Sequence, residues 1–186
     1  MRTAPTAIAA ALLAALTLTA CSSDDGDGGG DDGKTSAAPA ESGKGTACTA
    51  AAAGFEVGPS SAAPAAGDEG AVPVTVTNKG GAACTLTGLA HVELVLGEKN
   101  MPIRPQDGAS KDTRVTLEKG QSVTFTIAYV RGVAGDPEKG AEVDKLTFSL
   151  PGETKANSYD WPDAEVAFTS GGTLDATVGP FLPMGD

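Results

Sequence analysis

The side chains of this chain that could carry out chemistry are few. They are three cysteines, Cys21, Cys48 and Cys84, and one histidine, His91. General acid and base catalysis, nucleophilic attack and zinc binding usually bring several such groups together. The composition therefore excludes most arrangements for these reactions, and we expect no catalytic residue, no resident metal and no cofactor.

Cys21 ends a segment that is typical of an exported protein. Arg2 provides a positive start, and residues 7–20 form an apolar run shorter than the roughly 20 residues of a membrane-spanning helix. Residues 18–21, Leu-Thr-Ala-Cys, match the bacterial lipobox pattern. This match implies a signal peptide over residues 1–20 and a lipid on the thiol of Cys21, which would anchor the protein to the outer face of the plasma membrane. The alternative is a plain signal peptide followed by an incidental cysteine.

Cys48 and Cys84 remain as an even pair once Cys21 carries lipid. Disulfides form in the oxidising compartments that exported proteins reach. We therefore predict one disulfide between Cys48 and Cys84, which would stabilise the fold by about 4 kcal/mol in the loop-entropy model. The alternative, a thiol pair that binds copper or takes part in redox exchange, lacks a Cys-x-x-Cys spacing and a nearby histidine.

His91 has the same parity as Glu93 and the opposite parity to Val92, so we expect it on the surface. As a general base it would need a nucleophile and an orienting acid, and no sequence feature places them. As a copper ligand it would need Met101 or Met184 nearby in space. Binding of copper or another small ligand is the alternative function, and an enzyme is a residual one.

Tyr159 and Trp161 place two large amphipathic rings in the polar segment SYDWPD, which we expect to lie between strands. They are the candidate ligand contacts of the chain. The alternative, which we favour for Trp161, is that this ring caps the open end of the core, because tryptophan is mostly buried in proteins.

Alternating apolar and polar residues predict the strands that would position these groups. The predicted strands cover residues 72–77, 84–86, 92–96, 115–117, 123–129, 146–150, 166–168 and 174–178. The run 123–129 is the longest of them and the expected core strand, whereas Pro73 indicates an edge strand or a strand's start. No helical period follows the signal peptide, although residues 48–53 could form one helical turn. The pattern of seven to nine strands predicts an all-β fold, a single immunoglobulin-like antiparallel β-sandwich over residues 48–186.

The composition of residues 21–47 predicts a lipidated cysteine followed by a disordered, acidic Gly/Ser/Ala linker. The segment after Cys21 has no Val, Ile, Leu, Phe, Tyr or Trp, so it lacks the apolar surface that would offset chain entropy. Its aspartates do not have the spacing of an EF-hand calcium loop.

The net charge of the chain is −11, with 13 Lys and Arg against 24 Asp and Glu. Residues 48–186 carry ten of these basic residues and eighteen of the acidic ones. This charge disfavours binding to nucleic acid, and we expect neutral or cationic partners.

Several motifs resemble an actinobacterial family of exported proteins called domain of unknown function 4232. They are Cys48 at the start of the domain, Thr77 and Asn78 at a strand end, Cys84, Thr85 and Leu86 with the following Gly88, and the pair VTLEKGQSVTF. The resemblance covers most of residues 48–181 and implies a sandwich fold and the disulfide, but no activity. The function expected from the sequence is a membrane-anchored extracytoplasmic lipoprotein whose non-catalytic domain binds an unknown protein or small ligand through loops at an end of the sandwich.

Overall fold

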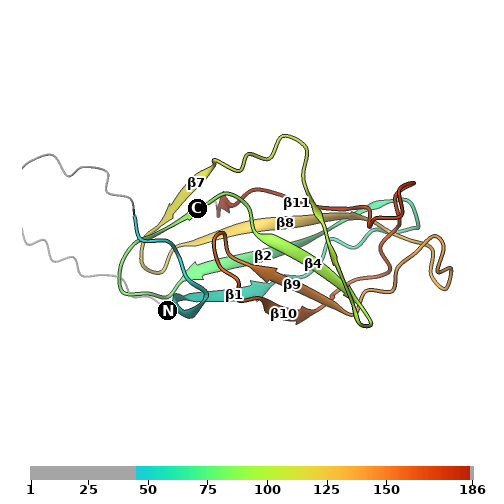
Figure 1. Ribbon diagram of the computed structural model, residues 1–186, viewed down its shortest axis with the longest axis horizontal. Coiled ribbons are helices and arrows are strands. Elements are labelled where there is room, and N and C mark those ends of the chain that lie inside the picture. Colours follow the sequence, from blue (N-terminus) through green and yellow to red (C-terminus); the bar gives the residue numbers. More distant parts are fainter. Residues whose placement is uncertain (1–44, 185–186) are drawn as a thin grey trace, which may run out of the picture. The chain divides into compact units, whose positions relative to one another are not determined.

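Two β-sheets packed face to face make up most of the computed structural model, which describes residues 45–184 (Figure 1). The predicted signal peptide, Cys21 and the predicted linker up to residue 44 lie outside the described residues. Figure 1 shows β2, β8 and β11 side by side, with β4, β9 and β10 running obliquely to them. The prediction of an all-β sandwich is confirmed.

The larger sheet has the strand order β1-β2-β8-β11-β6, and β12 also pairs with β8. Its strands are β1 (Ala53–Val57), β2 (Glu69–Asn78), β6 (Arg104–Pro105), β8 (Ser122–Val130), β11 (Ala176–Val178) and β12 (Leu182–Pro183). The second sheet has the order β10-β9-β4-β5, with β4 (His91–Leu96), β5 (Lys99–Pro102), β9 (Lys145–Ser149) and β10 (Asn157–Asp160). A small third sheet pairs β3 (Cys84–Thr87) with β7 (Arg114–Leu117). The one helical element among the described residues is a 3-10 turn, η1 (Ala50–Ala52), where a helical turn was expected.

The core lies between the two large sheets. In β8 the alternating side chains Val123, Phe125, Ile127 and Tyr129 are all buried, which confirms it as a core strand. The ring of Phe125 meets the ring of Phe148 from β9 edge to face, with centroids 5.5 Å apart. Such aromatic pairs add stabilisation beyond the apolar area that they bury, so this contact ties the two layers together.

The longest strand is β2, with ten residues, and not β8, with nine. The prediction started this strand at Val72, but the chain already pairs from Glu69, which lies opposite Val130. The residues before Val72 include Gly70, whose missing side chain leaves room for the ring of Tyr129. The alternation of side chains cannot show a strand at a position that has no side chain.

The prediction that Pro73 marks an edge strand or a strand's start was wrong, because β2 lies between β1 and β8. Pro73 of β2 is opposite Thr126 of β8, but the carbonyl of Thr126 points away from β2 and accepts a hydrogen bond from the N–H of Gly179. The carbonyl of Pro73 points away from β8, toward the β1 side, where it accepts a hydrogen bond from the N–H of Gly58. The proline nitrogen therefore also faces away from β8, at the point where β1 ends, and no ladder bond is lost.

One strand pair departs from the predicted antiparallel arrangement. Residues 99–106 leave the second sheet and join the larger one, and β6 then runs parallel to β11. Ile103 lies at the crossing, where its N–H donates to the carbonyl of Val92 at 3.1 Å. This crossing closes one side of the sandwich.

Other differences from the predicted strands lie near the sheet edges. Strands β1, β5, β6 and β12 were not predicted, and residues 157–160, expected as a polar segment between strands, form β10. Residues 166–168 and Leu174, predicted as strands, form only isolated bridges, such as Phe168 with Leu174. Most of the strands that were not predicted are short and largely exposed, as in β5, β6 and β12, so their sequences contain too few apolar residues to show an alternating pattern.

Candidate functional site

A groove of about 460 Å³ lies where β3, β4, β6 and β11 approach one another. Its apolar lining is Leu89, Ala90, Val92, Ile103, Pro105, Pro151 and Val178, and the remaining lining residues are Thr87, Gly88, His91, Lys111 and Gly152. Concave sites of this size with apolar walls and a few polar groups are the usual form of small-ligand sites. The groove is therefore the candidate binding site of the described chain.

Backbone hydrogen bonds hold the segments of the groove together. Gly88 donates to the carbonyl of Thr113 at 2.9 Å, which keeps the loop that carries Lys111 against the end of β3. Gly88 has φ +100°, and a Cβ here would lie 3.2 Å from the carbonyl oxygen of Lys111. Any side chain at this position would thus strain the backbone and crowd the loop.

A second hollow of about 480 Å³ lies between β7, β8 and β12. It is lined by Val115, Thr116, Leu117, Gln121, Ser122, Val123, Pro183 and Met184. None of these side chains is charged, and the side-chain Oε1 of Gln121 already accepts a hydrogen bond from the Glu118 N–H at 2.9 Å. We therefore consider the groove beside His91 the better candidate, because it has groups that could distinguish one ligand from another.

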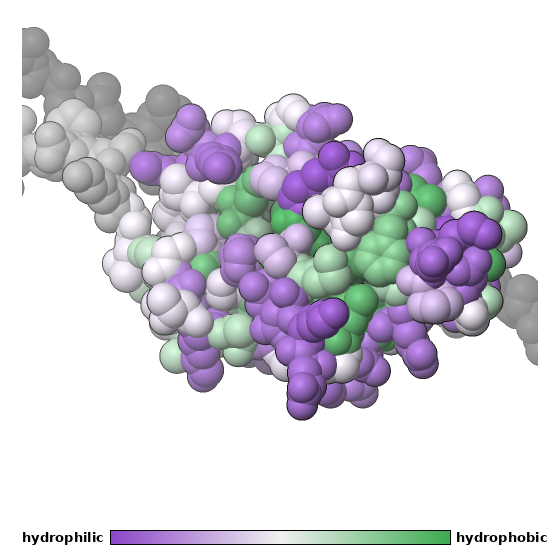
Figure 2. Space-filling model, turned by 45° about the vertical axis from the view of Figure 1, so that its right-hand side comes forward, coloured by the Kyte–Doolittle hydropathy of each residue, from purple (hydrophilic) through white to green (hydrophobic). Residues whose placement is uncertain are grey.

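Exposed apolar surface is limited on the described domain. Its exposed large apolar side chains are Val133, Leu182 and Met184. Figure 2 shows a face on which hydrophobic surface gathers in the middle and is bordered by hydrophilic side chains.

His91 lies on the surface, as predicted, with 68% of its side chain exposed. Its Nε2 is 3.6 Å from Oε1 of Glu93, and across the sheet it is paired with Ser149 of β9. No hydrogen bond joins Ser149 to His91 in the described structure. Ser149, His91 and Glu93 therefore do not form a hydrogen-bonded triad of nucleophile, base and acid. The register that brings Ser149 opposite His91 was not predicted.

The methionines of the copper hypothesis are not brought to His91. Met101 is paired with Leu94, so it lies on the inner face of the sheet, opposite to the face of His91. Met184 lines the second hollow. Among residues 45–184, no group of three His, Cys, Asp or Glu side chains could hold a metal ion.

Trp161 belongs to the core, with 8% of its surface exposed. Its ring meets that of Tyr129 edge to face at 5.4 Å, and its Nε1 donates to the carbonyl of Ala164 at 2.9 Å. Tyr159 is half-buried and stacks on Phe148 with ring centroids 5.8 Å apart. The two rings therefore do not form an exposed contact patch, and the interpretation of Trp161 as a cap on the core is confirmed.

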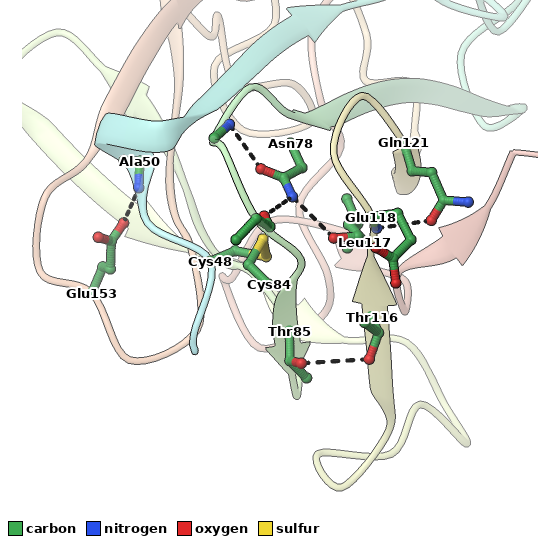
Figure 3. The surroundings of a disulfide bond; sticks show 12 residues. Cys48, Ala50, Asn78, Cys84, Thr85, Thr116, Leu117, Glu118, Gln121 and Glu153 are labelled. Atoms are coloured by element: carbon green, nitrogen blue, oxygen red, sulfur yellow. Dashed lines mark hydrogen bonds between the residues drawn. A yellow bond between two sulfur atoms is a disulfide. The ribbon is translucent and has the colours of Figure 1, made fainter. Parts of the chain in front are cut away.

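The predicted disulfide between Cys48 and Cys84 is present, with Cα atoms 4.8 Å apart (Figure 3). The chain enters the domain beside it, where Cys48 donates to the carbonyl of Thr85 and Ala47 forms a parallel bridge with Thr85. The disulfide thus fixes the entering chain to β3.

Asn78 connects the turns around the disulfide (Figure 3). Its side chain is buried, and its Nδ2 donates to the carbonyls of Ala82 and Leu117, both at 2.9 Å. Its Oδ1 accepts from the N–H of Gly80 at 2.9 Å, and its backbone carbonyl accepts from Gly120 at 2.8 Å. A buried side chain with all these partners is a structural element, because losing it would leave buried polar groups unpaired.

A family model described as domain of unknown function, DUF4232, matches residues 48–182. The chain belongs to this family. The match begins at Cys48 of the disulfide and ends in β12, so the DUF4232 domain is the sandwich itself. No curated protein and no solved structure matches the chain. Family membership thus confirms the resemblance and leaves the activity to be inferred from the site.

A buried polar contact lies at the end of the DUF4232 domain that holds Trp161. The Tyr129 hydroxyl and Oδ2 of Asp163 are buried neighbours, although neither has a hydrogen bond of ordinary geometry within the described chain. Burial, followed by the nearby Asp163 carboxylate, raises the pKa of Tyr129 to about 12. Burial also tends to raise the pKa of Asp163, but the hydroxyls of Tyr129 and Ser60, the Ala164 N–H and the charge of Arg131 together lower it. At neutral pH the phenol is therefore neutral and the carboxylate is charged.

Proposed function

We propose that this DUF4232 protein is a non-catalytic binding module, anchored by lipid to the outer face of the plasma membrane, that takes a small ligand in the groove beside His91. The observation that carries this proposal is the groove itself. It combines a lining of half-buried apolar residues, such as Leu89 and Ile103, with His91 and Lys111 at its border. This combination suits a ligand that is held by apolar contact and oriented by polar groups.

The groove and the chain that leads from the proposed anchor meet β3 at opposite ends, so an anchor on Cys21 is compatible with a ligand in the groove. The chain that leads from Cys21 joins the domain at Ala47 and Cys48, beside the first residues of β3. The groove starts at Thr87, the last residue of the same four-residue strand. Among the described residues, no helix has the length and hydropathy to cross a membrane. The lipid on Cys21 is the attachment that we propose.

The geometry around His91 supports a role without catalysis. Its carboxylate neighbour, Glu93, also accepts a hydrogen bond from Asn100 at 3.2 Å and is on the outer face of the sheet. A general base needs a nucleophile within hydrogen-bonding reach and an acid that orients it in a water-poor site. An exposed imidazole with one carboxylate at 3.6 Å does not meet this requirement.

Replacing Cys21 by alanine is expected to abolish lipid attachment. The expected lipid is bound through the thiol of residue 21, and alanine has none. The measurement is incorporation of labelled palmitate into the full chain in a bacterial host that processes lipoproteins, together with the mass of the exported product.

Ser22→Ala is the matched control, since it changes the adjacent residue and keeps the thiol. The unsubstituted chain and the control should both carry label, and Cys21→Ala should carry none. Equal labelling of Cys21→Ala and the control would show that the anchor is not on Cys21.

A further inference from the structure

The groove beside His91 differs in charge from the rest of the domain. Residues 48–186 have eighteen acidic and ten basic side chains, yet none of the twelve residues that line the groove is Asp or Glu. The lining residues include one lysine, Lys111, and one histidine, His91. The groove thus has one lysine and no acidic residue in its lining, on an otherwise acidic domain.

Lys111 is available to a ligand. The ion pairs within the described part of the chain join His91 to Glu93, Arg104 to Asp175, Lys139 to Asp136 and Lys145 to Asp160. Lys111 takes part in none of these pairs, and its residue is exposed. Its neighbour Asp112 is not part of the groove lining. The ammonium of Lys111 is thus free to meet an anionic group.

Two acidic residues, Glu93 and Glu153, each directly follow a lining residue in the chain, and both have other contacts. Glu153 follows the turn of Pro151 and Gly152, and its Oε2 accepts a hydrogen bond from the Ala50 N–H at 2.8 Å. Glu93 lies by a separate, smaller hollow that it shares with His91 and Thr147. Neither carboxylate lines the groove, so neither neutralises Lys111 there.

We propose that the groove binds a small amphiphilic anion, a molecule with a carboxylate head and an apolar chain. The chain would lie on the half-buried side chains of Leu89, Ile103 and Pro151, and the carboxylate would meet Lys111, with His91 close by. Burial of the chain supplies affinity, and the charge of Lys111 supplies preference for an anion. This inference depends on the proposed function, because it names the class of ligand for the same groove.

The test uses three probes of equal chain length that differ in charge: octanoate, octanol and octylammonium. They are titrated at pH 7 into the chain from residue 22 to residue 186, which keeps every residue that the structure describes. His91 is the one histidine of the chain, so its ring protons are a single NMR reporter at the groove. Octanoate should shift the His91 resonances saturably, with about threefold to fivefold higher affinity than octanol, and octylammonium should bind weakest.

Lys111→Gln is the variant that tests the assigned charge. It should weaken octanoate binding by about threefold to fivefold, to the level of octanol, and leave octanol binding unchanged. Lys119→Gln is the matched control, because it removes the same charge from an exposed position outside the groove and should change neither affinity.

The outcomes separate this inference from the proposed function. Equal affinity for octanoate and octanol, unaffected by Lys111→Gln, would overturn the anionic class and leave the groove as a binding site. A loss of octanoate affinity that is equal in Lys111→Gln and Lys119→Gln would also overturn it, since the effect would then come from net charge alone. Unchanged His91 resonances with all three probes would overturn both the proposed groove and its ligand class.

Discussion

Replacing Trp161 by alanine is expected to lower the free energy of unfolding by about 3 to 5 kcal/mol, as truncation of buried large aromatic residues does. The ring is 8% exposed and packs against Tyr129, and its Nε1–H is paired with the carbonyl of Ala164. The substitution removes these contacts and leaves a cavity beside a buried phenol. Thermal unfolding followed by circular dichroism measures the effect.

Tyr159→Ala is a suitable comparison, because it removes a ring of similar size from the same segment. Tyr159 is only half-buried and has one stacking partner, Phe148, so we expect a loss of about 1 to 2 kcal/mol. If Trp161→Ala instead melted at the temperature of the unsubstituted chain, the ring would be on the surface and the segment would again be a candidate for ligand contact.

Removing the disulfide by the paired substitutions Cys48→Ala and Cys84→Ala is expected to destabilise the domain by about 4 kcal/mol. The two cysteines are 36 residues apart in the sequence, so the disulfide restricts a large loop of the unfolded chain. It also holds the entering segment at the bridge between Ala47 and Thr85. For a domain of this size, the midpoint of thermal unfolding should fall by about 10 °C or more.

Substituting both cysteines avoids a free thiol, which could form bonds between molecules. Reduction of the unsubstituted chain should reproduce most of the shift, and the reducing agent should leave the double variant unchanged. A double variant as stable as the unsubstituted chain would show that the hydrogen bonds around Asn78 hold this end of the domain without the disulfide.

The central strands could be predicted from the sequence because apolar residues of the buried face alternate with polar residues of the opposite face along each of them. In β8, buried Phe125 and Ile127 alternate with Thr124 and Thr126. The edge strand β10 could not be predicted in this way, because its Asn-Ser-Tyr-Asp sequence has one large ring and three polar residues. The tertiary contact of Tyr159 with Phe148 decides its conformation, and no local pattern contains that contact.

The motifs that indicated the family turned out to have structural roles. The side chain of Asn78 lies close to the disulfide (Figure 3), and the N–H of Gly120 donates to the backbone carbonyl of Asn78. A resemblance carried by such residues predicts a fold better than it predicts a function.

The groove, in contrast, could not be predicted from the sequence. Its lining comes from segments around residues 87–92, 103–105, 111, 151–152 and 178, which the fold brings together. No two of these segments share a recognisable motif. The sequence could place His91 on the surface from its parity, but Lys111 had no signal that set it apart from the other lysines.

The measurement that tests the proposed binding site most directly is an amide chemical-shift map of the ¹⁵N-labelled chain, residues 22–186, titrated with octanoate. We expect the largest saturable shifts at Gly88, Leu89, Ile103, Lys111 and Gly152, which line the groove from separate segments. Shifts centred on the hollow between β7, β8 and β12, or no saturable shift at any amide, would contradict the account.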